Sequence, residues 1–219
     1  MERETDKAHL EKSTYKSEIR RQILSMRDKL EPQAKAQYDK AIREQVFAHP
    51  LYQESRIILA YASYRSEVDT SEMIRQALAD GKYVFAPKVS GPEMEFWQIT
   101  SPADLHRGYK GIPEPAAQVS FPEWRKQAAC RIGSSYQKTQ YRAMMWMPGA
   151  VFDRKRHRIG YGRGFYDRYL GRLYGEAGER KMLLTTAALA YLCQMVEELP
   201  CEAHDVKPDL VITEAGIIS

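Results

Sequence analysis

The sequence predicts an α/β fold with three layers, α/β/α, in which helices cover both faces of a mostly parallel β-sheet. The clearest observation lies in residues 56–90, where the apolar run RIILAYA (56–62) precedes a helical segment and a second apolar run, YVFAP (83–87). A strand, a helix and a strand within about thirty residues form a βαβ unit, whose strands are parallel. Toward the C-terminus, apolar runs typical of strands continue to alternate with segments of helical periodicity, which extends the βαβ pattern.

The first segment with a helical period starts near Lys16 and follows a charged stretch, residues 1–15. We expect that stretch to be a flexible leader and residues 16–219 to form a single domain. A second helical period covers residues 33–48, and we expect Pro32 to end the first helix because proline cannot continue one. The apolar positions of the first helix lie on one face: Ile19, Ile23, Met26 and Leu30.

The segment between the two apolar runs carries the boundary signals of a helix. Asp69 with Glu72 three residues later resembles a capping box, and Gly81 is placed as a C-terminal glycine stop. Residues 100–142 are rich in proline, glycine and polar residues, and we expect 116–142 to be a long surface excursion. Apolar or helical patterns predict the remaining elements: strands at 93–99, 143–149, 182–190 and 209–214, and helices at 165–174 and around 193–200.

The composition is that of an ordinary globular protein. Of the 219 residues, 43% are hydrophobic and 28% charged, and the net charge of +4 is too small for a dedicated nucleic-acid-binding protein. No apolar run reaches the roughly 18 residues that a transmembrane helix needs, and the N-terminus does not resemble a secretory signal. Three widely spaced cysteines indicate neither a disulfide framework nor a zinc site. We therefore expect a cytoplasmic monomer that binds small molecules and neither nucleic acid nor membranes.

The segment RIGYGRGFYDRYL (158–170) concentrates glycines ahead of a predicted helix. Glycines at alternate positions let the backbone turn its N–H groups toward one point, where the helix N-terminus adds partial positive charge. This arrangement favours an anion, above all a phosphate, and a plain tight turn is the alternative. Arg158 and Arg163 would supply counter-charge. Asp167 is placed either to favour the helix dipole or to bind a magnesium ion that bridges phosphates.

Several motifs in one order resemble the 5-formyltetrahydrofolate cyclo-ligase family, also called methenyltetrahydrofolate synthetases. The resemblance covers residues 16–214 and depends on five stretches: KSEIRRQILSMR, SYRSEVDT, GIPEP, MPGAVFDRKRHRIGYGRGFYDRYL and LPCEAHDVKPDLVITE. It implies a Rossmann-like fold of the NagB/RpiA/CoA-transferase-like kind. It also implies ATP- and Mg²⁺-dependent cyclisation of 5-formyltetrahydrofolate to 5,10-methenyltetrahydrofolate through phosphorylation of the formyl oxygen, a reaction that depends on positioning and on cations aimed at the phosphates.

The resemblance carries the family's nucleotide contacts over to two parts of the chain. Lys16 and Arg20 match its N-terminal ATP-binding motif and, four residues apart, share one face of a helix. The glycine segment matches its nucleotide loop, and Lys16 and Arg158, which we expect to be exposed, match its catalytic cations. The ATP-binding residues implied in this way are Lys16, Arg20, Arg158, Ile159, Gly160, Tyr161, Gly162, Arg163, Gly164, Phe165 and Tyr166.

The resemblance also implies a folate pocket and a metal site. Glu67 matches a carboxylate that can accept hydrogen bonds from the donor edge of a pterin ring, and without the resemblance it would be read as an ordinary loop carboxylate. Asp167 and Asp205 match two magnesium ligands. The substrate-binding residues implied in this way are Ala62, Glu67, Tyr161, Gly162, Arg163, Gly164 and Phe165.

Three positions depart from the family's pattern. Ala143 stands where many members have aspartate, Arg156 where they often have glycine, and Arg163 where glycine or lysine is usual. These departures leave open a second function, that of a non-catalytic folate- or nucleotide-binding relative. A third function, a nucleic-acid-binding patch at RKRHR (154–158) and residues 125–142, is less favoured because a five-residue charge run is usually a solvated face.

Overall fold

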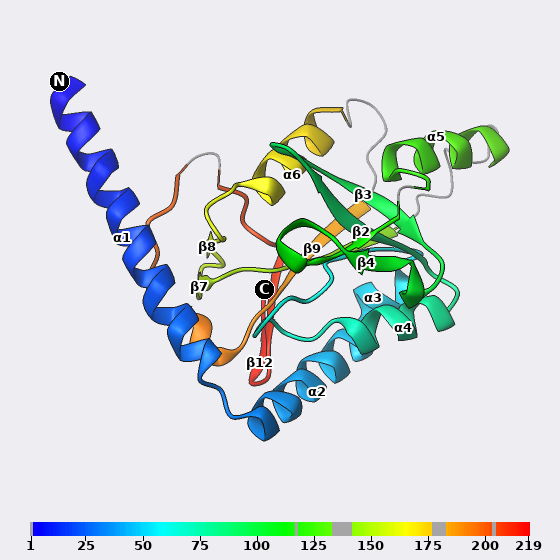
Figure 1. The fold of residues 1–219 in the computed structure, drawn as a ribbon, viewed down its shortest axis with the longest axis horizontal. Helices are drawn as coiled ribbons and strands as arrows, with labels where there is room; N and C mark the ends of the chain where they lie inside the picture. The colour runs from blue at the N-terminus through cyan, green and yellow to red at the C-terminus, as the bar shows by residue number, and fades with distance from the viewer. Residues whose placement is uncertain (1, 117, 133–141, 177–182, 203–204) are drawn as a thin grey trace.

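The fold is built on a seven-stranded β-sheet. The computed structural model describes residues 2–116, 118–132, 142–176, 183–202 and 205–219. The strand order is β12-β11-β9-β6-β1-β2-β3. The five inner strands are parallel, and the strand at each edge is antiparallel to its neighbour. Helices lie on both sides of this sheet, so the predicted α/β fold with a mostly parallel sheet is confirmed (Figure 1).

Helices and smaller elements lie between most of the successive strands of the main sheet, while short turns join β2 to β3 and β11 to β12. The strands are β1 (Ile57–Ala60), β2 (Tyr83–Ser90), β3 (Glu93–Ile99), β6 (Arg142–Met147), β9 (Leu183–Leu189), β11 (Leu210–Thr213) and β12 (Gly216–Ile218). The α-helices are α1 (Glu2–Asp28), α2 (Pro32–Ala48), α3 (Pro50–Glu54), α4 (Ser71–Ala79), α5 (Phe121–Ile132) and α6 (Phe165–Glu176). The short elements are η1 (Pro102–Asp104), β4 (Leu105–Arg107), η2 (Tyr109–Gly111), β5 (Pro113–Pro115), β7 (Val151–Asp153), β8 (Arg158–Ile159), η4 (Leu192–Gln194) and β10 (Met195–Val196).

Alternate residues of β1 face opposite sides of the sheet, as the period of a strand requires. Ile57 and Leu59 pack with residues of α5 and α6, whereas Ile58 and Ala60 pack with residues of α2 and α4. All four side chains are at most 1% exposed, so this strand is buried on both faces, as its unbroken apolar run predicts. Full burial contributes about 1.5–3 kcal/mol for each large apolar side chain. Contacts of this kind hold both helix layers to the sheet.

The βαβ unit predicted from the sequence is confirmed. β1 and β2 are parallel neighbours, with Ile57 beside Tyr83, and α4 lies between them in the chain. Gly81 follows α4 with a φ of +71°, in the left-handed region that favours glycine at the end of a helix.

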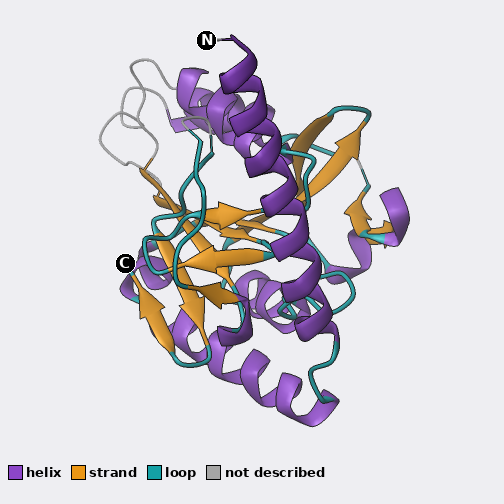
Figure 2. Cartoon of the chain, turned by 90° about the vertical axis from the view of Figure 1, so that its left-hand side faces the viewer, coloured by secondary structure: helices purple, strands orange, loops and turns teal. Residues whose placement is uncertain are grey.

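Helix α1 packs on a second, three-stranded sheet with the order β10-β7-β8. Its Ile23 belongs to one apolar cluster with Val151 and Ile159 of that sheet. From Glu2 onward, the predicted leader 1–15 is the first part of this helix, and its flexibility stays a prediction. The N-terminal end of α1 projects beyond the sheets in both views (Figures 1 and 2). Within the described residues, neither this helix nor a shorter one has the length and apolar character needed to cross a membrane.

Several predicted boundaries are corrected. α1 ends at Asp28, and Pro32 begins α2, where the missing N–H of proline costs nothing. Thr70 precedes α4 and makes no side-chain cap. Asp69 forms no capping box with Glu72 but accepts hydrogen bonds from Ser71. Around residues 193–200 the chain forms the short η4 turn and β10 instead of an α-helix.

The predicted surface excursion over 116–142 contains part of the core. In α5, Phe121 and Trp124 pack against Phe85 of β2, with ring centroids 5.0 and 5.6 Å from it. Both side chains are buried because α5 covers the same face of the sheet as α6. The prediction is therefore corrected over this helix, while residues 133–141 lie outside the described part of the chain.

The turn between β7 and β8 holds Arg156 in the left-handed region, with a φ of +67°. That conformation costs a residue with a Cβ roughly 1–2 kcal/mol. The Arg156 Nε is also buried without a hydrogen-bond partner among the described residues. The departure noted at this position therefore has a local cost, which glycine would avoid.

We predict that Arg156→Gly is more stable than Arg156→Ala by about 1 kcal/mol, because only glycine adopts this backbone without strain. Alanine serves as the matched control, since it removes the same side chain but keeps the Cβ. Urea denaturation of the two variants measures the difference. Equal stability, or a more stable alanine variant, would show that this turn is not strained.

Candidate active site

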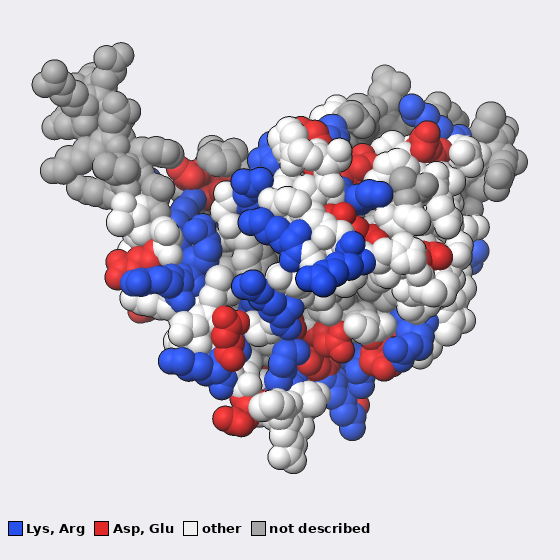
Figure 3. Space-filling model, viewed as in Figure 1, with Lys and Arg blue, Asp and Glu red and all other residues white. Residues whose placement is uncertain are grey.

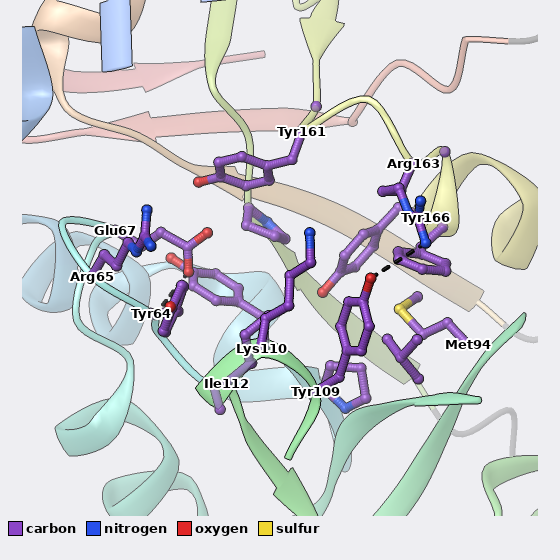
Figure 4. Close-up of a pocket in the computed structure, with 18 of the residues that line it drawn as sticks. Tyr64, Arg65, Glu67, Met94, Tyr109, Lys110, Ile112, Tyr161, Arg163 and Tyr166 are labelled. Atoms are coloured by element: carbon purple, nitrogen blue, oxygen red, sulfur yellow. Dashed lines mark hydrogen bonds between the residues drawn. The ribbon is translucent and has the colours of Figure 1, made fainter. Parts of the chain in front are cut away.

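A cavity of about 560 Å³ lies at the end of the sheet where β1 and β6 end. Tyr61 and Ala62 line it directly after β1, and Pro148 lines it directly after β6. Ligands of open α/β sheets bind outside the carboxyl ends of the strands, and this volume is typical of small-molecule sites. Two segments form opposite parts of its wall (Figure 4). We call residues 61–70 the β1–α4 loop and residues 160–164 the glycine loop.

The β1–α4 loop brings the two predicted folate residues, Ala62 and Glu67, to the cavity. Ala62 is buried, and Glu67 lies beside the labelled Tyr64 and Arg65 (Figure 4). The backbone N–H of Tyr64 donates a hydrogen bond of 2.9 Å to Glu67 Oε2. This bond fixes the carboxylate within its own loop. The folate-binding role of both residues stays a prediction.

The surroundings of Glu67 shift its protonation in two directions. Burial raises the pKa of Glu67, while the nearby Tyr161 hydroxyl, the hydrogen bond from the Tyr64 backbone and the charge of Arg27 oppose that rise. Burial prevails, so the pKa of Glu67 lies above its ordinary value. The carboxylate therefore takes up a proton at a higher pH than an exposed glutamate does.

The backbone of the glycine loop favours glycine at Gly162 and Gly164, and space is tight at Gly160. Gly162 and Gly164 have φ values of +88° and +60°, in the left-handed region. A Cβ at Gly160 would lie 3.1 Å from Nη1 of Arg158, closer than most real contacts. The cavity-lining residues from the loop and the start of α6 are Gly160, Tyr161, Arg163, Gly164, Phe165, Tyr166 and Asp167.

Arg158, which we expected to be exposed, is buried, with 4% of its side chain accessible. Its Nη2 donates to Asp167 Oδ1 at 2.8 Å, and the Val206 backbone N–H donates to the same oxygen at 3.1 Å. Arg158 still lines the cavity, so its guanidinium can face a ligand. Its neighbour Ile159 precedes the glycine loop and is anchored there by burial against apolar residues of α1.

The two N-terminal cations lie outside the lining of the cavity, and Lys16, which we expected to be exposed, has only 15% of its side chain accessible. Lys16 Nζ pairs with Glu202 at 2.9 Å and with Asp205 at 2.8 Å. Burial opposes the charge of Lys16, but hydrogen bonds to the two carboxylates outweigh it and raise the pKa of Lys16. Arg20 Nε donates to the Gly160 carbonyl oxygen at 2.7 Å. Arg20 therefore holds the backbone of the glycine loop, and direct ATP contact by either cation stays a prediction.

The two predicted magnesium ligands, Asp167 and Asp205, come from α6 and from the segment before β11. They lie near each other, because the N–H of Val206, next to Asp205, donates to Asp167. Oxygen donors suit Mg²⁺, which is commonly bound by one or two carboxylates together with substrate phosphates. Among the described residues, groups of three or more His, Cys, Asp or Glu side chains gathered as for a metal are absent. Two carboxylates would leave the other ligands of such an ion to phosphate oxygens and water, and metal binding by Asp167 and Asp205 stays a prediction.

Among the lining residues that sequence reasoning missed are Arg27, Tyr109 and Lys110. Arg27 is four residues beyond Ile23, so a cation on the apolar face of the first helix was the available signal. Tyr109 and Lys110 belong to η2, in a region without periodicity. Arg163 Nη2 donates to the Tyr109 hydroxyl at 3.3 Å, which joins η2 to the glycine loop (Figure 4).

The cavity is rich in cations, and Lys and Arg side chains gather across the centre of the molecular face in Figure 3. Two of the lining cations, Arg65 and Lys110, have φ values of +55° and +54°. Non-glycine residues in this region are uncommon and cluster at functional sites. The lining has five cations and four carboxylates, a small positive excess that favours an anionic ligand: Arg27, Arg65, Lys110, Arg158 and Arg163 against Asp28, Glu67, Glu114 and Asp167.

The fold and this cavity together are those of an α/β enzyme that acts on small molecules. The chain belongs to the 5-formyltetrahydrofolate cyclo-ligase family, whose model matches residues 12–214, and it is therefore a ligase. The resemblance seen in the sequence is thus confirmed.

Relatives and solved structures agree with this assignment. The chain is 28% identical over 178 residues to the 5-formyltetrahydrofolate cyclo-ligase of Mus musculus, covering 79% of this chain and 80% of that one. It is 29% identical to the mitochondrial cyclo-ligase of Arabidopsis thaliana, over 98% of this chain and 78% of the relative. The 5,10-methenyltetrahydrofolate synthetase of Aquifex aeolicus superposes with a TM-score of 0.71 at 26% identity, over 92% and 91% of the two chains.

We predict that Arg158→Ala lowers the free energy of unfolding by about 3 kcal/mol, because it leaves the Asp167 carboxylate without its buried cation. Lys155→Ala is the control, since it breaks an ion pair with Glu198 whose partners are both exposed and should leave stability unchanged. Urea denaturation without ligand measures both. An Arg158→Ala protein as stable as the Lys155→Ala protein would contradict the burial described here.

Proposed function

We propose that the protein catalyses the ATP- and Mg²⁺-dependent cyclisation of 5-formyltetrahydrofolate to 5,10-methenyltetrahydrofolate, with release of ADP and phosphate. One observation carries this proposal: Ala62 and Glu67, predicted for the folate, line the same cavity as Arg158 and Tyr166, predicted for the nucleotide. Glu67 and Ala62 lie on the β1–α4 loop, and Arg158 and the glycine loop lie across from it. Transfer of the γ-phosphoryl group to the formyl oxygen requires both substrates in one space, held in a reactive geometry.

The chemistry explains why a ligase would need ATP at this step. The formyl group on N5 is an amide, and its oxygen is a poor leaving group. Phosphorylation turns that oxygen into part of a phosphate, which leaves readily. N10 then attacks the formyl carbon and loses its proton, and the oxygen departs with the phosphate as the five-membered ring closes. Positioning and charge stabilisation supply most of the catalysis of phosphoryl transfer.

The residues of the cavity suit the two halves of this task. Arg158 and backbone N–H groups of the glycine loop, with the N-terminal end of α6, are suited to hold the phosphates. Arg20 acts through the Gly160 carbonyl and so positions the loop. On the opposite side, the Glu67 carboxylate is suited to accept hydrogen bonds from the donor edge of the pterin ring.

Asp167 and Asp205 are the residues that would hold Mg²⁺. When bound, the ion neutralises charge on the phosphates during transfer. Asp167 is kept in place for this role by Arg158 and by the Val206 N–H, and Asp205 by Lys16 and by the Glu202 N–H.

The positions of the three departures bear on the alternative, a non-catalytic relative. Ala143 is buried in β6 on the sheet face covered by α5 and α6, and Arg156 lies in the β7–β8 turn. Neither residue belongs to the lining of the cavity. Arg163 does line it, but keeps the positive charge of lysine. The catalytic function is therefore the better supported one.

We predict that the purified protein, given ATP, MgCl₂ and 5-formyltetrahydrofolate, produces methenyl-folate absorbance and one ADP for each methenyl group formed. Omission of ATP, or chelation of magnesium by EDTA, should abolish the signal, because the formyl oxygen then stays unphosphorylated. Calorimetry with each substrate accompanies the assay. Tight binding without turnover would favour the non-catalytic relative, and failure to bind either substrate would overturn both functions.

We predict that the affinity for 5-formyltetrahydrofolate falls as the pH is lowered through the pKa of Glu67. The binding form is the carboxylate, which predominates above that pKa and is lost below it. Because the pKa of Glu67 is raised, the midpoint of this loss lies above pH 4.5. Glu67→Gln should bind more weakly at neutral pH and show no such dependence. Calorimetry over a pH series measures it, with the exposed Glu72→Gln as control. The same acid dependence in Glu67→Gln would remove Glu67 from this role.

A further inference from the structure

We propose that Arg27 is a positioning residue for this reaction, which ties the β1–α4 loop to the glycine loop through hydrogen bonds to Ser66 and Tyr161. The inference rests on the proposed function, because it assigns a task to Arg27 within the same substrate site. Nothing in the sequence motifs assigns such a task to Arg27. The contacts, the burial and the charge balance around its guanidinium support it independently.

The guanidinium of Arg27 contacts three segments that are distant in the chain. Its Nε donates to Ser66 Oγ at 3.0 Å in the β1–α4 loop, and its Nη1 donates to the Tyr161 hydroxyl at 2.8 Å in the glycine loop. Nη1 also lies 3.5 Å from the Gly149 carbonyl oxygen after β6. The rigid fork of arginine suits such simultaneous contacts, which the single ammonium of lysine cannot reproduce. Arg27 therefore joins both walls of the cavity from outside the sheet.

Burial makes the charge of Arg27 consequential. Only 4% of the residue is exposed, and an arginine cannot give up its proton in a protein. A buried cation needs negative partners, and the carboxylates that interact with Arg27 are Glu67 and Asp28. Asp28 also accepts a hydrogen bond from the Ser66 hydroxyl. The charge of Arg27 is thus balanced in part by the carboxylate that we assign to folate.

Tyr161 completes the connection. Its hydroxyl accepts from Arg27 and interacts electrostatically with the Glu67 carboxylate, so Tyr161 connects Arg27 with Glu67. In Figure 4 the Tyr161 hydroxyl points to the side of the cavity that carries Glu67. Because the Tyr161 backbone belongs to the glycine loop, the position of that loop and the position of the folate carboxylate depend on one another.

Arg27 is the cation whose charge opposes the raised pKa of Glu67. The other ionisable groups near Glu67 are Arg65 of the same loop and tyrosines: Tyr61, Tyr161 and Tyr166 beside the carboxylate, and Tyr191 at the backbone carbonyl. Loss of Arg27 would therefore remove a positive charge that acts on the buried Glu67, and the protonated form of Glu67 would be favoured.

The closing experiment measures the Kd for 5-formyltetrahydrofolate by calorimetry, and KM and kcat by the absorbance assay, for Arg27→Met and Arg27→Lys. In Arg27→Met we expect Kd and KM for the folate to rise at least about tenfold, since hydrogen bonds to a charged group are lost. We expect kcat to change much less. The fall of kcat/KM on the acid side of its pH profile, which we call the acid limb, should move to higher pH. Arg27→Lys should restore the acid limb, because the charge is kept, but only part of the affinity.

Arg172→Met is the matched control. Arg172 packs over the Tyr169 ring at 5.5 Å, much as Arg27 packs over the Tyr161 ring at 5.8 Å. It pairs with Glu93 and Glu95 and donates to the Met94 carbonyl oxygen, but does not itself line the cavity. The Arg172→Met variant shows how much the loss of an arginine that packs on a tyrosine changes stability and folate affinity in general. Tyr161→Phe removes the shared hydroxyl without touching Arg27. Its effect on Kd should not add to that of Arg27→Met in the double variant, because both break one connection.

The outcomes separate the two proposals. If the wild-type protein binds the folate without turnover, the proposed reaction is contradicted. The ratio of the folate Kd of Arg27→Met to that of the wild type still decides the role of Arg27. An Arg27→Met protein that melts like the Arg172→Met control and keeps the wild-type Kd and acid limb overturns the role of Arg27. If Arg27→Met does not fold, Arg27→Lys and Tyr161→Phe decide: wild-type affinity in both overturns the inference, and weakened affinity in both supports it.

Discussion

The parallel pairing of β1 with β6 is the constraint on which the rest of the site depends. Ala60 lies beside Trp146 in this pairing, so the two strands end together at one edge of the sheet. The β1–α4 loop and the segment that leads to the glycine loop must then leave the sheet side by side. Both strands are buried on both faces, which leaves this edge as the place where the chain can open a cavity. Sheet topology thus fixes which loops face each other, and their side chains set what the cavity can bind.

Helix α1 also positions residues of the site, although it lies outside the main sheet. Ile23 anchors it to β7 and β8, and Lys16, Arg20 and Arg27 share the stripe of α1 that faces the site. Along this stripe the three cations meet three different parts: the segment around Asp205, the glycine loop and the β1–α4 loop. One apolar anchor on a helix therefore positions three charged contacts, and a shift of α1 would disturb all three together.

The sequence predicted the features that depend on local pattern. The apolar run at Ile57–Ala60 predicted a strand buried on both faces, and the glycine segment predicted a loop that only glycine can form. Features that depend on distant partners were missed. Phe121 is buried because α5 finds Phe85, and Arg158 is buried because its charge is paired with Asp167. Polar and basic residues near these positions in the sequence indicate a solvent-exposed segment. A single sequence does not show which charged side chains form ion pairs in the fold.

The charge pairs around the cavity also indicate how it can accept charged substrates without leaving a buried charge uncompensated. Arg158 is paired with Asp167, and Lys16 with Asp205. In the proposed reaction, phosphate oxygens would take the place of the carboxylates beside the cations, and magnesium would take the place of the cations beside the carboxylates. Each cation and each carboxylate would thereby exchange one partner of opposite charge for another, so none of them is left unpaired. A site that holds its cations and its metal ligands in mutual pairs is thereby ordered before the nucleotide arrives, and the cost of bringing like charges together is avoided.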